Sequence, residues 1–174
     1  EAAFQGALAW VEKMTDADYG RVGYIMRGSG VARPQSLVDA FPGEKSEAMT
    51  AAGISIRMMC GQTAKANRLV QKGAELLRKL PPNWDPKDGS IDTYYWYLGT
   101  LAKYHIGGKN WRHWADSLNY ATMPRQEKYV HIAVNKDSWD PLGPWGADGG
   151  RVYATAVHIQ MLAVLQAALS DDGN

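Results

Sequence analysis

The side chains best suited to holding a ligand are four consecutive aromatic residues, Tyr94-Tyr95-Trp96-Tyr97. Successive residues of a helix point around its whole circumference, so one or two of these rings must face away from the main core. Aromatic rings beside a few acids and an arginine suit a carbohydrate, a peptide or an apolar ligand. The sequence therefore predicts an accessible aromatic face on this segment.

Catalytic motifs do not accompany these rings. No Asp-x-Asp-Asp motif occurs, Cys60 is the single cysteine, and the four histidines lack the paired spacing of a zinc site. The glycine-rich segments at 27–30 and 146–150 neither follow a predicted strand nor contain the lysine of a phosphate-binding loop. We therefore assign no catalytic residue and expect neither a metal nor a cofactor.

Glycine and proline divide the chain into segments of helical period. Asp92 is the expected N-cap of one helix, because its carboxylate can accept hydrogen bonds from the free amides of the first turn. The glycine-rich stretch 18–30 is too irregular for a helix or a confident strand. The predicted helices cover residues 2–13, 46–60, 63–80, 94–106, 110–123 and 151–170. The fold class is therefore all-α, in a single domain over 1–174.

Two segments repeat one design. Trp84-Asp85-Pro86 and Trp139-Asp140-Pro141 each lead through an Asp-Gly pair into an apolar helix. Repeats of this length are typical of stacked units that cannot bury their apolar faces alone. Trp84 and Trp139 are therefore expected to fill gaps between successive helical hairpins, and Asp85 and Asp140 to accept hydrogen bonds in turns or caps.

Composition narrows the classes of partner. The 174 residues include 19 basic and 18 acidic side chains, and no basic stripe of the kind that binds nucleic acid. No window approaches the roughly 20 consecutive apolar residues that cross a bilayer. We expect neither a nucleic-acid partner nor a membrane span in this segment. The compartment stays open, with export to the periplasm expected only if an upstream signal has been removed.

Three segments carry a family resemblance: 49–53, 92–100 and 149–156. They resemble the inner-helix starts of prenyltransferase and squalene-oxidase repeat proteins, which are terpenoid cyclase-like. The chain is most similar to planctomycete-type bacterial members that carry this repeat without an assigned reaction. Residues 72–84 resemble a degenerate Gln-Trp motif of the terpene cyclases, with Pro81 in place of the glutamine. The resemblance implies an α/α toroid of helical hairpins, here partial and with long Gly/Pro-rich loops.

The resemblance also implies where a ligand would lie. It places one set of residues near the openings of the inner helices, where a cavity or concave end forms: Asp92, Tyr95, Trp96, Arg151, Tyr153 and His158. Because the acid motif of the cyclases and the zinc ligands of the protein prenyltransferases are missing, we expect a non-catalytic module. Its ligand would be a small molecule, a glycan or a peptide, or its partner a protein.

Two enzymatic alternatives stay open. One is a terpene cyclase or prenyltransferase-like enzyme, or a fragment of one. The other is a polysaccharide-active α/α enzyme that uses Asp92 or Asp148 with a tyrosine. A deep apolar tunnel lined by Tyr95, Trp96 and His158 would favour the isoprenoid enzyme, and an open groove with exposed aromatic rings would favour a glycan or peptide binder. A filled centre would favour a scaffold.

Overall fold

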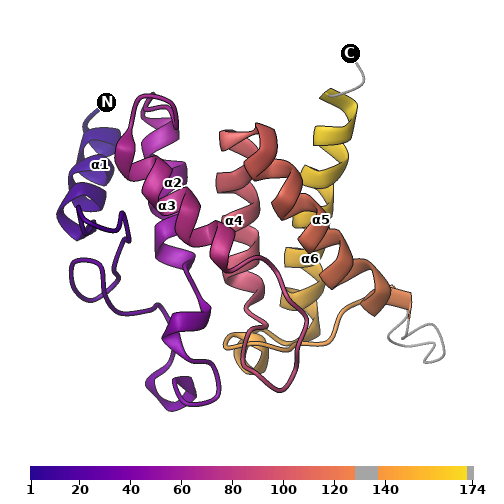
Figure 1. Cartoon of the computed structure of the whole chain (residues 1–174). Helices are drawn as coiled ribbons and strands as arrows, with labels where there is room; N and C mark the ends of the chain where they lie inside the picture. Colours follow the sequence, from indigo (N-terminus) through magenta and orange to yellow (C-terminus); the bar gives the residue numbers. More distant parts are fainter. Residues whose placement is uncertain (128–136, 172–174) are drawn as a thin grey trace.

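The computed structural model describes residues 1–127 and 137–171, and its regular elements in these ranges are helices joined by loops (Figure 1). The described residues contain no β-strand, only two isolated bridges, Thr15 with Val22 and Met26 with Ser29. The helices are α1 (Ala2–Met14), α2 (Ala48–Met59), α3 (Arg68–Lys79), α4 (Thr93–Ile106), α5 (Gly108–Glu127) and α6 (Gly146–Asp171), with two short 3-10 turns, η1 (Gln35–Leu37) and η2 (Gly43–Lys45). The predicted all-α class is confirmed.

The long helices pack in two rows. α4 lies between α2 and α6, while α3 packs on α2, α5 packs on α4, and α1 covers the other side of α2. In Figure 1, α3 and α5 cross in front of the row formed by α2, α4 and α6. The long loops that precede α2, α4 and α6 gather at one end of the molecule, at the bottom of the view. The first turns of these three helices therefore lie at the same end.

The hydrophobic core is centred on α4, which is buried against both of its neighbours. Trp114 of α5 packs directly on Gly99 of α4, where an added Cβ would lie 2.3 Å from the indole ring. The indole N–H of Trp114 donates a hydrogen bond to Thr100 Oγ1 over 3.0 Å. Glycine at position 99 is therefore what allows α5 to approach α4 so closely.

Three helix boundaries differ from the sequence prediction by more than two residues. α3 begins at Arg68 rather than at residue 63, because the side chain of Asn67 caps it by accepting from the amides of Leu69 and Val70. α5 continues through Pro124 to Glu127, since a proline close to a helix end removes only one backbone donor there. α6 begins at Gly146 and is interrupted at Gly150, whose φ of 62° and ψ of −167° are outside the helical region.

α6 also bears on the predicted absence of a membrane span. The stretch Gly146–Ser170 is the one helix in the described ranges that is long and apolar enough to cross a bilayer, judged by length and composition. The core helix of a water-soluble protein, which is mostly buried, meets the same two criteria, whereas 22% of the apolar window of this helix is buried. The absence of a span therefore stays a prediction.

Candidate functional site

An open groove lies where the first turns of α2, α4 and α6 meet. Its volume is about 600 Å³. We call it the aromatic groove, and it is lined by Tyr24, Ala32, Met49, Tyr94, Trp145, Asp148, Gly149 and Tyr153. Met49 and Tyr94 belong to the first turns of α2 and α4, and Tyr153 follows the break at Gly150 in α6. The groove therefore depends on the side-by-side packing of three helix starts.

Two of its walls are aromatic rings set nearly at right angles. The ring centroids of Tyr94 and Trp145 are 6.2 Å apart, with an angle of 71° between the planes. Tyr24, from the glycine-rich loop, is 54% exposed. Burial raises the pKa of the Tyr94 and Tyr153 hydroxyls, so both stay protonated and neutral at neutral pH. The groove thus offers ring faces and neutral phenols.

Polar groups of two kinds border these rings. Trp145 Nε1 is buried and has no hydrogen-bond partner among the described residues, although a buried N–H is normally paired. Asp148 is exposed and is the one carboxylate among the lining residues. A Cβ on Gly149 would lie 2.5 Å from that of Tyr153, so glycine keeps this side of the groove clear. The lining residues thus carry a buried, unpaired indole N–H and an exposed carboxylate.

A buried ion pair lies behind the groove. Asp92 caps α4 by accepting from the amide of Tyr95 over 3.0 Å, and an Arg33 guanidinium nitrogen lies 3.0 Å from its other oxygen. Both side chains are almost fully buried. Burial raises the pKa of the Asp92 carboxyl and lowers that of Arg33, against the attraction between the two groups. With both oxygens engaged, Asp92 fixes the loop on α4 and is not free to act on a ligand.

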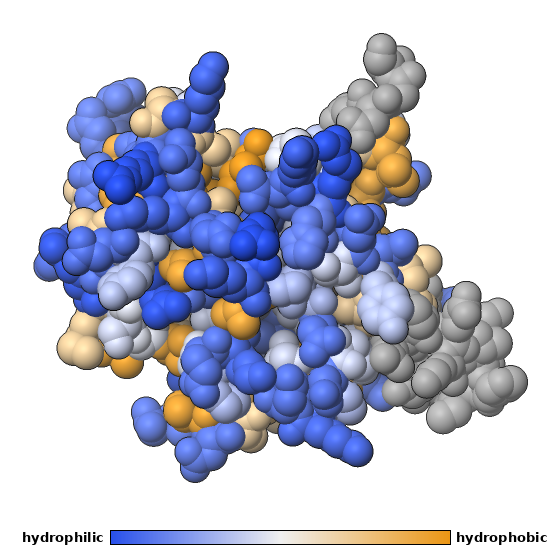
Figure 2. All heavy atoms as spheres, in the orientation of Figure 1, coloured by the Kyte–Doolittle hydropathy of each residue, from blue (hydrophilic) through white to orange (hydrophobic). Residues whose placement is uncertain are grey.

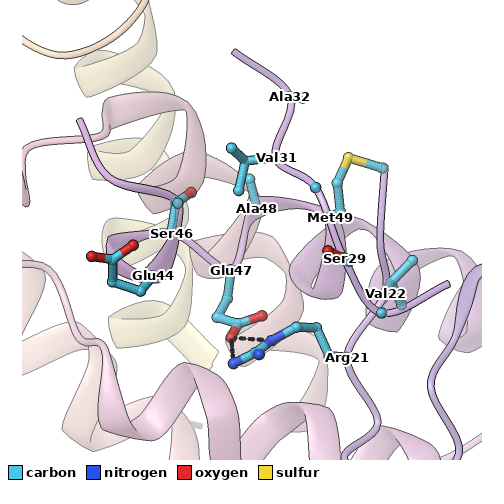
Figure 3. A pocket seen from close by; sticks show the side chains of 13 residues that line it. Arg21, Val22, Ser29, Val31, Ala32, Glu44, Ser46, Glu47, Ala48 and Met49 are labelled. Carbon is cyan, nitrogen blue, oxygen red and sulfur yellow. Dashed lines mark hydrogen bonds and ion pairs between the residues drawn. The ribbon is translucent and has the colours of Figure 1, made fainter. Parts of the chain in front are cut away.

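A second, smaller pocket of about 290 Å³ adjoins the aromatic groove, and Ala32 and Met49 line both (Figure 3). Arg21 and Glu47 point toward one another in this pocket, with Arg21 Nε 2.8 Å from Glu47 Oε1. The other Glu47 oxygen accepts from the hydroxyl of Thr50 over 2.7 Å. Both oxygens of Glu47 are therefore engaged, and the carboxylate holds the loop of Arg21 on the start of α2.

Of the six residues predicted to bind a ligand, Tyr153 lines the aromatic groove. Tyr95 and Trp96 are buried, although both border a small pocket of about 190 Å³ beside Leu80. The Tyr95 hydroxyl donates to Leu80 O over 2.7 Å. Arg151 forms an ion pair with Asp140 and donates to Ser138 Oγ over 3.2 Å, which anchors the loop before α6. The structure thus does not gather the six residues around one cavity.

The sixth residue, His158, lies in an aromatic cluster away from the groove. We call it the indole cluster: Trp84, Trp96, Trp139 and His158. The imidazole stacks on Trp139 with centroids 4.7 Å apart, and it lies 6.1 Å from the ring of Trp84. Trp84 is also 6.1 Å from Trp96. The tryptophans of the two repeated triplets therefore meet on the same histidine of α6.

Hydrogen bonds fix this cluster and its turns. Trp139 Nε1 donates to Thr122 O of α5 over 3.2 Å, and His158 Nδ1 lies 2.8 Å from Ala154 O. A carbonyl can only accept, so neutral His158 carries its proton on Nδ1. Burial lowers the pKa of His158 to about 4. In the first triplet, Asp85 accepts from the amide of Lys87 over 2.9 Å, which is a turn.

Tyr24 and Trp145 are the aromatic groove residues that the sequence did not single out. Both come from loops: Tyr24 lies in the glycine-rich stretch, and Trp145 stands between Pro144 and Gly146. Loops held by a rigid scaffold often carry binding residues. Aromatic residues inside Gly/Pro-rich connections are the signal that could have identified them.

No group of three His, Cys, Asp or Glu side chains within 1–127 and 137–171 is placed to hold a metal ion. Comparison of the chain with family models, with curated proteins and with solved structures finds no match.

Proposed function

We propose that this chain is a non-catalytic binding module of the α/α-toroid type, and that the aromatic groove holds a glycan. The observation that carries the proposal is the groove itself, in which crossed aromatic rings stand beside an unpaired indole N–H and an exposed carboxylate. An open groove favours a glycan or peptide binder, whereas an isoprenoid enzyme would need a deep apolar tunnel.

The packing of the helices supports the toroid type. The chain alternates between the two rows, since α2, α4 and α6 form one row and α3 and α5 pack against it. The repeated tryptophans precede α4 and α6, and both pack on His158. This is the arrangement expected when neighbouring hairpins supply each other's apolar contacts. The hairpins α2–α3 and α4–α5, together with α6, would form an arc with its concave end at the helix starts.

The filled centre argues against both enzymatic alternatives. Tyr95, Trp96 and His158 are each at most 1% exposed, so they line no tunnel for an isoprenoid. Glycoside hydrolysis needs two carboxyl groups flanking the bond. Asp148 is the one carboxylate that lines the groove, and Asp92 is held by Arg33 and the amide of Tyr95.

The chemistry of the groove favours a glycan over a peptide. A sugar ring offers apolar C–H faces for the rings of Tyr94 and Trp145, and hydroxyl or acetamido oxygens that can accept from Trp145 Nε1. Its hydroxyl groups can also donate to Asp148. A peptide bound in extended form would gain most of its affinity by pairing with a strand edge, and the described residues contain no strand.

A glycan array followed by titration calorimetry tests this proposal. We expect the 174-residue chain to bind a defined set of oligosaccharides, and Trp145→Ala to weaken that binding about tenfold or more, which corresponds to ~1.4 kcal/mol. Tyr120→Ala is the matched control, because Tyr120 is 81% exposed on α5, outside the groove. Its affinity should equal that of the unmodified chain.

Two results would contradict the proposal. Binding to a peptide library without binding to glycans would replace the ligand class and leave a binding module. Hydrolysis of a glycan by the purified chain, abolished by Asp148→Asn, would instead establish the polysaccharide-active enzyme.

A further inference from the structure

The charge on the lining of the aromatic groove has one sign. Asp148, in the first turn of α6, is exposed, and no Lys, Arg or His stands among the lining residues. Asp148 takes part in none of the ion pairs of the described residues. The pocket that adjoins the groove adds a second exposed carboxylate, Glu44. The carboxylate of Asp148 is therefore available to a cation of the ligand.

The basic side chains near the groove are engaged with carboxylates of the protein. Arg33 belongs to the buried ion pair behind the groove. Arg21 is held by Glu47 in the adjoining pocket, and Arg151, just after the break in α6, forms an ion pair with Asp140. An acidic sugar would therefore face carboxylates without a cation among the lining residues, whereas a cationic sugar would meet a complementary charge.

The aromatic rings of the groove add to this preference. The face of an aromatic ring carries partial negative charge and attracts a cation placed over it, and the attraction is strongest for tryptophan. Four rings line the groove together with Asp148, those of Tyr24, Tyr94, Trp145 and Tyr153. A cation in the groove is thus attracted by ring faces and by a carboxylate at the same time.

The size of the groove shows that a cation alone does not fill it. An ammonium group is about as large as a water molecule, which occupies roughly 30 Å³ in the liquid. The groove has a volume of about 600 Å³, which is in the usual range for small-molecule sites. There is room for a sugar ring that packs on the aromatic side chains and carries the cation as a substituent.

We propose that the glycan of the aromatic groove is an amino sugar, whose protonated amine pairs with Asp148 while its ring packs against Tyr94 and Trp145. This assignment rests on the proposed function, because it specifies the class of glycan. An N-acetylated sugar has the same ring and offers no charge to Asp148. The groove therefore discriminates between sugars of the same skeleton by the charge on one nitrogen.

Two oligosaccharides of equal length test this inference, a chitosan oligomer and a chitin oligomer, which differ in the acetylation of their amines. Titration calorimetry is carried out in mildly acidic buffer, where the free amines are protonated. We expect the Kd of the chitosan oligomer to be lower by about tenfold or more. Added salt should reduce this difference, because it screens the attraction between exposed charges.

Asp148→Asn separates the effect of the charge from that of the rings. It keeps the shape of the side chain and removes its charge, so it should weaken binding of the chitosan oligomer about tenfold and bring the two Kd values together. Asp116→Asn is the matched control and should keep the preference. Asp116 is exposed on α5, a helix that crosses a largely hydrophilic face of the molecule (Figure 2). Circular dichroism should show equal helix content in both variants.

Each other outcome overturns the inference, and the proposed function is judged separately. Equal binding of both oligomers, or tighter binding of the chitin oligomer, leaves a glycan-binding module without a preference for amino sugars. A preference that survives Asp148→Asn is not carried by this carboxylate. An oligolysine peptide that binds as tightly as the chitosan oligomer shows that the groove recognises a cation without a sugar. If neither oligomer binds, the inference is wrong, and binding of another glycan on the array decides whether the proposed function stands.

Discussion

The indole cluster and the aromatic groove are built from the same kinds of side chain but differ in their access to water. In the cluster, Trp139 and His158 are stacked and at most 1% exposed. In the groove, Tyr94 and Trp145 meet edge to face and border an open volume of about 600 Å³. Aromatic composition therefore does not by itself identify a binding site. What decides is whether a ring's second face meets protein or solvent.

The two regions also differ in whether the indole N–H groups are hydrogen-bonded. The indole N–H of Trp139 is paired with Thr122 O, whereas that of Trp145 has no partner within the described ranges. A paired buried donor stabilises the fold, and an unpaired one costs free energy until a ligand accepts from it. We therefore assign stability to the cluster and recognition to the groove, and the following predictions separate the two roles.

The largest effect is expected inside the cluster. Trp139→Ala should lower the free energy of unfolding by about 3–5 kcal/mol, because it removes a buried ring and leaves a cavity on His158. Urea denaturation measures this loss, and Trp139→Phe should recover part of it. A loss below about 1 kcal/mol would mean that the cluster contributes no more than a surface contact.

The next largest effect is expected at the buried Arg33–Asp92 ion pair behind the groove. Arg33→Met should cost about 3 kcal/mol, because it leaves the buried carboxylate of Asp92 without its cation. The matched control is Arg78→Met, which removes the exposed pair with Glu75 and should change the free energy of unfolding by less than about 1 kcal/mol. Equal effects in urea denaturation would contradict the distinction between a buried and an exposed pair.

A pH titration of stability tests the burial of His158. Its pKa is about 4 in the folded chain against a usual value of 6.5, so between these values the unfolded chain binds more protons. The contribution is complete above pH 6.5 and is lost as the pH falls toward 4. From pH 7 to pH 5 the free energy of unfolding should fall by about 2 kcal/mol through this group.

The control for this titration is the exposed His113. His113→Gln should keep the pH dependence of stability, and His158→Gln should remove about 2 kcal/mol of it. If both variants keep the same slope as the unmodified chain, the imidazole of His158 is not held neutral by burial.

The smallest effect is expected at the open end of the groove. Tyr24→Ser should change the free energy of unfolding by less than about 0.5 kcal/mol, because the ring is more than half exposed. Thermal unfolding provides the measurement. A large loss would show that the loop of Tyr24 is part of the core and not a wall of a binding site.

The fold was more predictable from sequence than the site. Apolar periodicity and the Gly/Pro punctuation predict the all-α class, and Asp92 caps α4 as expected from its position. The prediction of where α3 begins was wrong, because the cap that decides it is the side chain of Asn67. Such local hydrogen bonds depend on the backbone path that precedes the helix.

The site was harder to predict, because adjacent residues of α4 differ in whether they line the groove or are buried in the core. Tyr94 faces the groove and Tyr95 faces the core, although their side chains are chemically identical. The direction of each ring is set by the rotation of α4 between α2 and α6, which local sequence does not encode. Tyr24 and Trp145 reach the groove through long loops, whose paths depend on contacts such as the Arg33–Asp92 pair.

The most direct test of the account is an NMR titration of the indole N–H signals with a glycan selected from the array. The chain has seven tryptophans, so each indole can be followed separately once its signal is assigned by substitution with phenylalanine. We expect the Trp145 signal to shift on binding, because its unpaired N–H gains an acceptor, while the Trp139 signal stays in place. A shift of Trp139 with no change at Trp145 would contradict it.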